Sequence, residues 1–447
     1  MKTKNNEKEH RLTRRSFFKE SAAGFLGAGL GLSGAAGSAS AAADGPAQDL
    51  PADTLRIKDY RILGRTGFKV SDISCGSMMD EYLLRHALQA GMNYLDTAEE
   101  YPGHHRIVAR AIKGFDRNSL FITTKLEVQN DKTKAGFIRR TRQALEELQA
   151  EYVDCLMMHM PERAETLKTE GFHEAMQELK TEGRVKYVGV SNHGSFWFKD
   201  PEETMEKVLT AAADDGRFDV FLVAYNFLRY DQSEKVLELA RRKNIGVALM
   251  KTMPVAIYES LRDRVEAAEK KGQSVHPLYV EGVKRYKEKF EAAQEFIKKY
   301  NLTNPQEIKE AAIKFVLGNP NVSTACLRAK NYNELDSFIK LSGSRLDVPA
   351  QSKLDAYREG CGNLYCRHAC GICEPSCPHG VPINTIMRYQ QYFAGQGREK
   401  EAMELDAAIP GIRADACFDC PGPCEKACPY GVPVQGMLLV AHETLLL

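Results

Sequence analysis

The cysteines are the residues whose spacing most directly suggests chemistry. Nine of the twelve lie between Cys361 and Cys428, and eight of these form two near-copies of one motif ending in Cys-Pro. The copies are Cys366-x3-Cys370-x2-Cys373-x3-Cys377-Pro378 and Cys417-x2-Cys420-x3-Cys424-x3-Cys428-Pro429. Thiolates at this spacing bind metals, so the pattern leaves three alternatives: zinc sites, iron–sulfur clusters and disulfides.

Four polar residues in the first half of the chain have the types needed for carbonyl reduction. Asp96, Lys125 and His159 each end a short apolar run, and Tyr101 follows Asp96 by five residues. A tyrosine has an ordinary pKa of about 10 and donates a proton well only when a cation such as Lys125 lowers it. Asp96 would hold the lysine. A neutral His159 would hydrogen-bond a carbonyl oxygen while Tyr101 protonates that oxygen as hydride arrives at carbon.

Alternating strands and helices must position these residues. Strand-like runs are expected at Ile73–Ser77, Asn93–Thr97, Leu120–Lys125, Val153–His159, Tyr187–Ser191, Val220–Tyr225, Gly246–Lys251 and Ser323–Leu327. Amphipathic segments lie between them, as at Gly136–Leu148, Thr169–Glu182, Ser233–Lys243 and Gln306–Leu317, and Tyr60–Val70 is typical of a hairpin. Eight strand–helix units predict an α/β fold, a parallel (β/α)8 TIM barrel over residues 59–345, with active groups at the C-terminal strand ends.

The same stretch resembles the aldo-keto reductase family over most of Asp59–Ser342. The matching segments are Leu63–Ser71, Asn93–Tyr101, Thr124-Lys125, Tyr152–Leu156 with His159 and Pro161, Gly183–Lys186 and Gly189–Asn192. The resemblance implies that Asp96, Tyr101, Lys125 and His159 are the catalytic tetrad, with Tyr101 as the acid. It also implies that Ser191 and Asn192 grip the carboxamide of a nicotinamide cofactor, NADP(H).

The chain departs from the family at nucleotide-binding positions. Leu222 stands where the family usually has a Gln that binds the nicotinamide amide. After the eighth strand, Ala325–Asn331 replaces a Gly-containing phosphate loop, and there Arg328 or Lys330 would meet a 2′-phosphate or pyrophosphate through charge. Lys251, which ends the seventh strand, is a further candidate for cofactor binding. These departures leave nucleotide binding open.

Two other features set this barrel apart from the family. Pro102, His104 and His105 follow the tyrosine in place of the usual residues, which predicts an altered substrate mouth. A metal site at the two histidines is disfavoured, because adjacent residues on a loop do not easily face one ion. Val255–Tyr300, rich in Lys and Glu, is expected to be a helical insertion after the seventh strand.

The cysteine motifs resemble those of two-cluster ferredoxins, in which the fourth cysteine of each motif binds the other cluster. The resemblance implies two 4Fe-4S clusters, one on Cys366, Cys370, Cys373 and Cys428 and the other on Cys417, Cys420, Cys424 and Cys377. Each copy has one inserted residue, and Cys361 is a spare thiol that could replace Cys366. Helical patterns at Ile383–Asp406 and Val434–Leu447 predict a mainly α-helical domain over residues 357–447, whose terminal run packs against the barrel.

The N-terminus is typical of an export signal. Residues 1–20 carry seven Lys or Arg and three Glu, and residues 21–43 carry no charge. Thr13–Lys19, with Arg14 and Arg15, resembles the twin-arginine motif. A membrane anchor is the alternative, but Gly, Ala and Ser dominate the uncharged stretch. We expect a signal peptide over residues 1–43, a linker over 44–58, periplasmic export and no membrane span in the mature chain.

The composition gives no electrostatic footprint for nucleic acid, because 61 Lys and Arg nearly cancel 60 Asp and Glu. A small carbonyl or alcohol is the expected substrate.

A nicotinamide moves two electrons and each cluster one, and no flavin motif connects them. Two hypotheses follow. One is an exported oxidoreductase of the aldo-keto reductase type, whose clusters link it to a redox partner protein. The other is an electron-transfer or binding protein whose barrel has lost nicotinamide-dependent chemistry.

Overall fold

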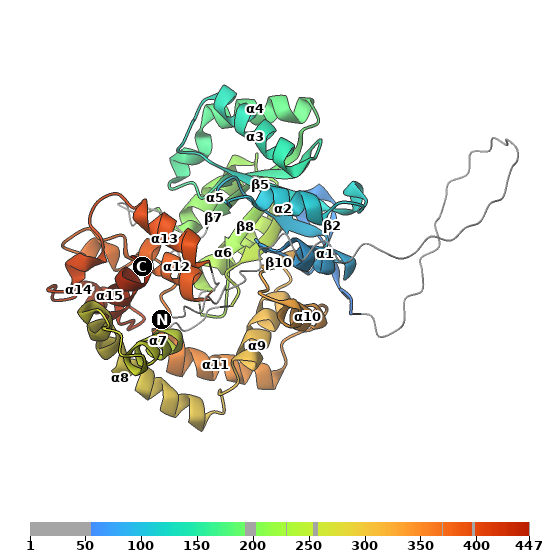
Figure 1. The fold of residues 1–447 in the computed structure, drawn as a ribbon. Coiled ribbons are helices and arrows are strands. Elements are labelled where there is room, and N and C mark those ends of the chain that lie inside the picture. Colours follow the sequence, from blue (N-terminus) through green and yellow to red (C-terminus); the bar gives the residue numbers. More distant parts are fainter. Residues whose placement is uncertain are drawn as a thin grey trace, which may run out of the picture. The chain divides into compact units, whose positions relative to one another are not determined.

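Eight short strands pair in parallel and close into a barrel in the computed structural model (Figure 1). In barrel order they are β3 (Ile73–Cys75), β4 (Tyr94–Asp96), β5 (Phe121–Glu127), β6 (Val153–His159), β7 (Val185–Asn192), β8 (Val220–Ala224), β9 (Gly246–Met250) and β10 (Thr324–Leu327). Each strand begins and ends within two residues of the run expected from sequence. The predicted parallel TIM barrel is therefore confirmed.

The structure describes residues 55–192, 203–228, 230–253, 258–368, 370–395 and 398–446. The predicted signal peptide lies outside these ranges, so the signal peptide and the domain boundaries stay predictions. Residues Asp53–Leu447 group into one unit by their contacts. Among the helices of the described ranges, none is both long and apolar enough to cross a membrane.

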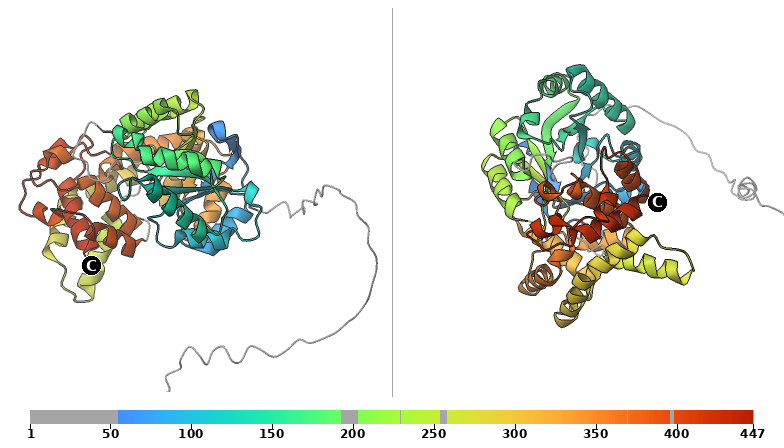
Figure 2. Two further views of the ribbon diagram at one scale, coloured as in Figure 1. Left: turned by 90° about the horizontal axis from the view of Figure 1, so that it is seen from above. Right: turned by 90° about the vertical axis from the view of Figure 1, so that its left-hand side faces the viewer.

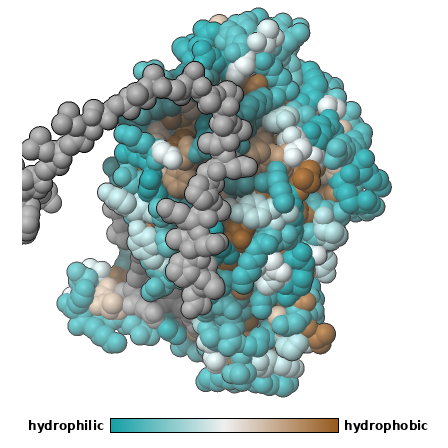
Figure 3. All heavy atoms as spheres, turned by 90° about the vertical axis from the view of Figure 1, so that its right-hand side faces the viewer, coloured by the Kyte–Doolittle hydropathy of each residue, from teal (hydrophilic) through white to brown (hydrophobic). Residues whose placement is uncertain are grey.

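Helices cover the outside of the barrel (Figures 1 and 2). They are α1 (Glu81–Gln89), α2 (His104–Ala111), α3 (Lys134–Leu148), α4 (Glu170–Thr181), α5 (Met205–Asp215), α6 (Asp231–Arg242), α9 (Pro305–Gly318) and α10 (Tyr332–Lys340). Several begin at a side-chain cap: Asp80 accepts from two backbone N–H groups of α1, and Thr133 from one of α3. The outward face seen in Figure 3 is mainly hydrophilic with scattered apolar residues, as amphipathic helices require.

A hairpin closes the N-terminal end of the barrel. Its strands are β1 (Tyr60–Ile62) and β2 (Lys69–Ser71), joined through the short helix η1 (Gly64–Thr66). Leu63 and Val70 are fully buried in the same cluster as the inward-facing strand residues Phe121 and Met157. Because this end is filled by side chains, only the opposite, C-terminal end of the barrel is left for a site.

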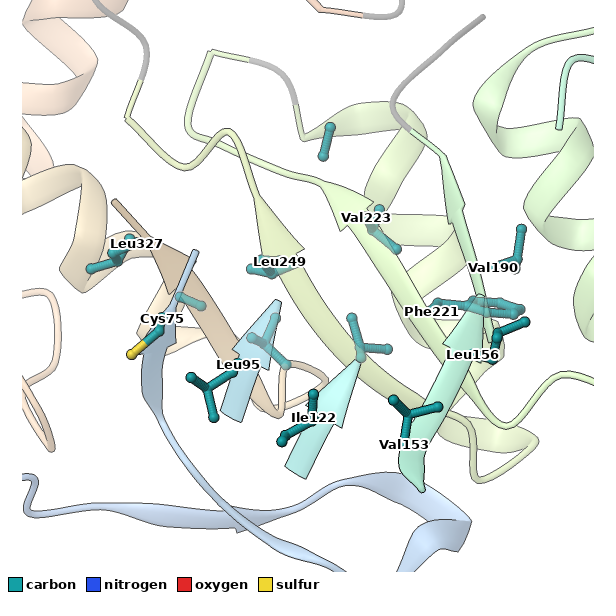
Figure 4. Close-up of a cluster of buried hydrophobic side chains, with 14 of the residues drawn as sticks. Cys75, Leu95, Ile122, Val153, Leu156, Val190, Phe221, Val223, Leu249 and Leu327 are labelled. Carbon is teal, nitrogen blue, oxygen red and sulfur yellow. The ribbon is translucent and has the colours of Figure 1, made fainter. Parts of the chain in front are cut away.

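Successive residues of each strand point to opposite sides of the barrel wall. One set packs outward against the helices, and the other points into the barrel interior. Leu95, Ile122, Leu156, Phe221 and Leu249 belong to one buried cluster with the helices, and Figure 4 shows them along the strands. Their neighbours with the opposite parity point into the barrel. The inward set is apolar near the hairpin and polar at the C-terminal ends, where Asp96, Lys125 and His159 stand.

The helical insertion and the C-terminal region pack together (Figure 1). The insertion contains α7 (Tyr258–Lys270) and α8 (Pro277–Lys299). The C-terminal helices are α11 (Val348–Cys361), α12 (Ile383–Gln390), α13 (Glu399–Ala407), α14 (Pro423–Ala427) and α15 (Val434–Leu445). The short helical turns of the chain are η2 (Arg117–Ser119), η3 (Ala164–Lys168), η4 (Gly362–Leu364), η5 (Glu374–Ser376), η6 (Gln391–Gly395, a π-helix) and η7 (Ala414–Cys417).

Two expectations for this region were wrong in detail. The terminal helix α15 packs mainly against α8, α12 and η7 rather than against the barrel. The helical run expected over Ile383–Asp406 is divided into α12, η6 and α13. The physical reason for the first difference is that the insertion itself supplies an apolar partner, since Tyr286 and Phe290 of α8 share a buried cluster with Leu438 and Leu439.

The contact between α8 and α15 depends on two glycines. A Cβ atom built on Gly282 would lie 2.6 Å from Val440 Cγ2 and 2.7 Å from the carbonyl oxygen of Gly436, too close for real atoms. A Cβ atom on Gly436 would lie 2.9 Å from Arg285 Cβ. The two helices therefore approach to backbone contact, which only glycine permits.

We predict that Gly282→Ala lowers the melting temperature. Overpacking costs about 1–3 kcal/mol, more than the gain of about 0.5–1 kcal/mol from alanine in a helix. The matched control is Gly318→Ala at the end of α9, where a Cβ atom meets nothing within 4 Å. Thermal unfolding followed by circular dichroism measures both variants. Equal melting temperatures for the two would contradict the proposed helix contact.

Candidate active site

The C-terminal end of the barrel holds one cavity of about 160 Å³ in which the predicted tetrad meets. Asp96 ends β4, His159 ends β6, and Lys125 lies in β5 two residues before its end at Glu127. Tyr101 enters from the loop between β4 and α2. All four line the cavity, so the structure brings together the residues that the sequence singled out.

Lys125 and Asp96 form a buried ion pair. Lys125 is fully buried, and its Nζ lies 2.8 Å from each carboxylate oxygen of Asp96. Lys125 Nζ also donates to the carbonyl oxygen of Thr97 at 2.8 Å. Burial alone would lower the pKa of Lys125, but the Asp96 carboxylate outweighs it and holds the pKa above its ordinary value. The lysine is therefore a permanent cation at the cavity wall.

Tyr101 lies against this cation. Lys125 Nζ is 4.9 Å from the centroid of the Tyr101 ring. Burial raises the pKa of Tyr101 to about 12, and the Lys125 charge lowers it only in part. The expectation that Lys125 makes this phenol unusually acidic is corrected, because loss of solvent outweighs the cation. Tyr101 is protonated at neutral pH and has a proton to donate.

His159 has a partner that sequence reasoning missed. Its Nδ1 contacts a carboxylate oxygen of Glu100, the residue directly before Tyr101. Burial would raise the pKa of Glu100, but the neighbouring His159 and Lys125 hold it below its ordinary value, so the group is a carboxylate. A carboxylate at Nδ1 keeps a proton there. The Glu100 contact at Nδ1 fixes the orientation of the His159 ring and leaves Nε2 for a substrate oxygen.

His104 and His105 begin α2 instead of lying on a loop, and neither lines the cavity. His104 contacts Thr97 Oγ1 at 2.9 Å and the carbonyl oxygen of Met78 at 3.0 Å. Burial lowers the pKa of His104 to about 3, so its ring is neutral. His105 contacts Thr124 Oγ1 at 2.8 Å and Glu147 at 3.2 Å. Both histidines therefore hydrogen-bond to residues next to the tetrad, Thr97 and Thr124, and neither side chain lines the cavity.

Of the two nicotinamide-binding candidates, Ser191 lines the cavity and Asn192 does not. Ser191 lines the cavity, and its buried hydroxyl has no hydrogen-bond partner among the described residues, as a waiting ligand contact would require. Asn192 donates from Nδ2 to the carbonyl oxygen of Pro161 at 3.0 Å. Leu222 also lines the cavity and offers it no hydrogen bond. Ser191 thus fits a carboxamide, while the wall beside it is apolar.

Three cationic candidates, Lys251, Arg328 and Lys330, line the same cavity as the tetrad. Lys251 follows β9 with a backbone φ of 59°, a left-handed conformation that is strained for a lysine. Burial lowers the pKa of Lys251, and it lowers the pKa of Arg328 to about 10. All three cations therefore stand at the cavity of the tetrad, and their contact with a nucleotide phosphate stays a prediction.

The C-terminal region completes the cavity with Gln391, Tyr392 and Arg398. Gln391 and Tyr392 lie on η6, and Arg398 precedes α13. Lys251 Nζ donates to the Tyr392 hydroxyl at 3.3 Å. The Arg398 guanidinium lies 4.4 Å from the ring centroid of Tyr392 and 5.7 Å from that of Tyr101. No motif marks these three residues, because they lie between the cysteine motifs and reach the barrel only through the fold.

The cysteines gather in the two sets implied by the ferredoxin resemblance, and all twelve are free thiols. Cys366, Cys370, Cys373 and Cys428 line one small cavity of about 20 Å³. Burial, then the thiolates of Cys370 and Cys428, raise the pKa of Cys366. In the other set, burial and then Cys424, Cys377 and Cys420 raise the pKa of Cys417 to about 12.

Cys361 is separate from both sets. It ends α11 and lines another cavity with apolar neighbours such as Phe290 and Leu364. Cys366 therefore belongs to the first set. Throughout the described ranges, no group of three or more His, Cys, Asp or Glu could hold a metal ion. The four thiolates of a 4Fe-4S cluster each bind a different iron atom. They therefore lie farther apart than four thiolates that bind one zinc ion through Zn–S bonds of about 2.3 Å. The cluster assignment stays a prediction.

Comparisons with known proteins agree on the barrel. The sequence profile of the aldo/keto reductase family matches residues 79–358, more than half of the chain. Methylglyoxal reductase DkgB of Salmonella typhimurium is 30% identical over 188 residues, which is 41% of this chain and 64% of the relative, so the chain spans less than two thirds of it. Aldo-keto reductase YhdN of Bacillus subtilis is 22% identical over 67% of this chain and 94% of its own length.

Two solved structures are similar to the barrel part of the chain. Aldo-keto reductase AKR11C1 from Bacillus halodurans, in its holo form, is 20% identical with a TM-score of 0.49, over 67% of this chain and 96% of that one. An aldo/keto reductase from Klebsiella pneumoniae, in complex with NADP and acetate, is 19% identical with a TM-score of 0.46, over 66% of this chain and 94% of that one.

We predict that Tyr392 ionises at lower pH than an ordinary tyrosine. Burial would raise the pKa of Tyr392, but Lys251, Arg388 and Arg398 more than offset it and lower the pKa below its ordinary value. Removing the Lys251 charge should raise that pKa again. Ultraviolet titration of phenolate, comparing Lys251→Met with the native protein and Tyr392→Phe, measures the shift. Lys340→Met, an exposed charge on α10, is the control. An unchanged titration in Lys251→Met would refute the contact.

Proposed function

Because the chain belongs to the aldo/keto reductase family, we propose that it is an oxidoreductase that interconverts a carbonyl and an alcohol in the barrel cavity, with Tyr101 as general acid and base. The observation that carries the proposal is the convergence of Tyr101, Lys125, Asp96 and His159 on one cavity. Such a set has a proton donor, a fixed cation and a hydrogen-bonding imidazole within reach of one substrate oxygen.

In this proposal each residue of the set has one step. Tyr101, protonated at neutral pH, gives its proton to the carbonyl oxygen. Lys125, held by Asp96, stabilises the phenolate that this leaves, because an adjacent cation favours the charged form. His159 orients the substrate oxygen through Nε2, with its ring fixed by Glu100. NADP(H), when bound, supplies or accepts the hydride, and Ser191, Asn192 and Lys330 are the residues that would hold it.

A second candidate, an electron-transfer or binding protein whose barrel has lost nicotinamide-dependent chemistry, is favoured by the size of the cavity. Ligand pockets usually measure about 300–1,000 Å³, whereas this cavity measures about 160 Å³. The C-terminal residues Gln391, Tyr392 and Arg398 fill part of the mouth. A dinucleotide would enter only if this segment moved aside.

For the C-terminal region we propose two 4Fe-4S clusters that exchange electrons with a redox partner protein. The two sets of four cysteines support this, because each takes one cysteine from the other motif, as in two-cluster ferredoxins. One cluster would be held by Cys366, Cys370, Cys373 and Cys428, and the other by Cys417, Cys420, Cys424 and Cys377.

Export through the twin-arginine route, after cluster insertion in the cytoplasm, is part of the proposal and rests on Arg14 and Arg15.

Replacing the proton donor tests the barrel chemistry. Tyr101→Phe removes the transferable proton and keeps the ring, so turnover should fall about a hundredfold or more. NADPH oxidation with methylglyoxal, the substrate named for the Salmonella relative, is the first assay, followed by small aldehydes, ketones and sugars. Tyr82→Phe, on an exposed tyrosine of α1, is the matched control. If Tyr101→Phe turned over a substrate as fast as Tyr82→Phe, the second candidate function would replace the first.

The clusters are tested by metal and sulfide analysis after anaerobic purification. We expect about eight iron and eight sulfide per chain, with an electron paramagnetic resonance signal on reduction. Cys373→Ala should remove or convert one cluster, because Cys373 lies in the first set. Cys361→Ala should leave the iron content unchanged, because Cys361 lines a different cavity. Stoichiometric zinc without iron would overturn the assignment.

A further inference from the structure

The walls of the catalytic cavity carry an excess of positive charge. Lys125 is neutralised by Asp96, Lys309 by Glu334 and Arg398 by Glu401. Three lining cations remain, Lys251, Arg328 and Lys330, and within the described part of the chain no carboxylate lies within ion-pairing distance of them. Lys330 is exposed, whereas Lys251 and Arg328 are half-buried. The neighbouring Arg398 lowers the pKa of Lys251 and Arg328, after burial, because like charges are forced together.

Unpartnered polar atoms surround the same cavity. Arg328 Nη1, Ser191 Oγ and Gln391 Oε1 are buried and have no hydrogen-bond partner among the residues described. All three residues line the cavity. Buried polar atoms in folded proteins are nearly always satisfied, so a guanidinium nitrogen, a hydroxyl and an amide oxygen without partners on one cavity indicate a wall suited to a polar ligand. A guanidinium calls for an anion, and an amide oxygen calls for a hydroxyl or N–H donor.

We propose that the cavity binds a small carboxylate-bearing substrate, a 2-oxo acid or the corresponding 2-hydroxy acid, with Arg328 and Lys251 holding the carboxylate. The inference rests on the proposed function, because it names the substrate class of that same site. In the reduction, one hydride adds to C2 and the Tyr101 proton adds to the carbonyl oxygen. The 2-oxo acid becomes a 2-hydroxy acid, and NADPH is oxidised to NADP⁺.

A substrate carboxylate fits the position of these cations better than a nucleotide phosphate. Arg328 and Lys251 line the cavity that contains Tyr101. Tyr101 is close enough to Arg328 to raise its pKa in part against the effect of burial. The cavity of about 160 Å³ has room for a small acid. Planar guanidinium groups also suit the two oxygens of a carboxylate.

The test compares two probes of the same shape that differ in charge, racemic lactate and racemic lactamide. Isothermal titration calorimetry measures their binding to the full-length protein as purified. We expect lactate to bind at least about tenfold more tightly than lactamide, the size expected for hydrogen bonds to a charged group. Arg328→Met and Lys251→Met should each abolish most of that preference. Lys340→Met removes an exposed charge on α10 and should leave it unchanged.

Further binding measurements distinguish a failure of this inference from a failure of the proposed function. If Arg328→Met weakens the binding of NADP⁺ and leaves the lactate preference intact, Arg328 serves a nucleotide phosphate and the inference is overturned. Equal binding of lactate and lactamide by the native protein also overturns it. The lactate preference should persist in Tyr101→Phe, which binds without turnover. Lactate preference without turnover of any carbonyl would refute the proposed function alone, and turnover of neutral carbonyls without lactate preference would refute this inference alone.

Discussion

The buried ion pair between Lys125 and Asp96 is the interaction on which the site depends. The inward-facing positions nearer the hairpin are mainly apolar, and an ammonium group there would be too costly without a counter-charge. Removing one partner of such a pair costs about 3–5 kcal/mol. The parallel register sets Asp96 beside Thr123, two residues before Lys125 on the next strand. Pairing the strands therefore brings the charges together, and the loop after β4 then carries Tyr101 onto the lysine.

The C-terminal region is part of the same cavity and no separate appendage to the barrel. The glycine contact between α8 and α15 fixes the region to an insertion of the barrel domain. A mixed apolar cluster adds a second attachment, in which Phe227 and Leu228 pack with Leu354 and Tyr365. Held at these places, the region puts Arg398 over the ring of Tyr101 and Tyr392 against Lys251. The cations that crowd the cavity therefore come from both parts of the chain.

Sequence patterns predicted the barrel and the tetrad because both depend on local periodicity. Apolar runs separated by amphipathic segments define the strands, and a polar residue at the C-terminal end of a run has to face the barrel mouth. The residues that contact the tetrad and Lys251 cannot be predicted from such patterns. Glu100 was overlooked beside Tyr101 because only the folded loop turns it towards His159. Tyr392 and Arg398 depend on packing between segments more than 130 residues apart, for which no spacing rule exists. The acidity expected for Tyr101 failed because burial depends on what covers the site.

The consecutive helices α12 and η6 connect the first cysteine set with the catalytic cavity. At the start of α12, Asn384 donates from Nδ2 towards Cys366 Sγ at 3.7 Å and to the carbonyl oxygen of Arg367 at 2.8 Å. Eight residues later, on the adjoining π-helix η6, Tyr392 lines the catalytic cavity. The first cysteine set therefore lies at the start of α12, and Tyr392 lies just beyond its end. The same short segment thus contacts the first cysteine set through Asn384 and Lys251 through Tyr392.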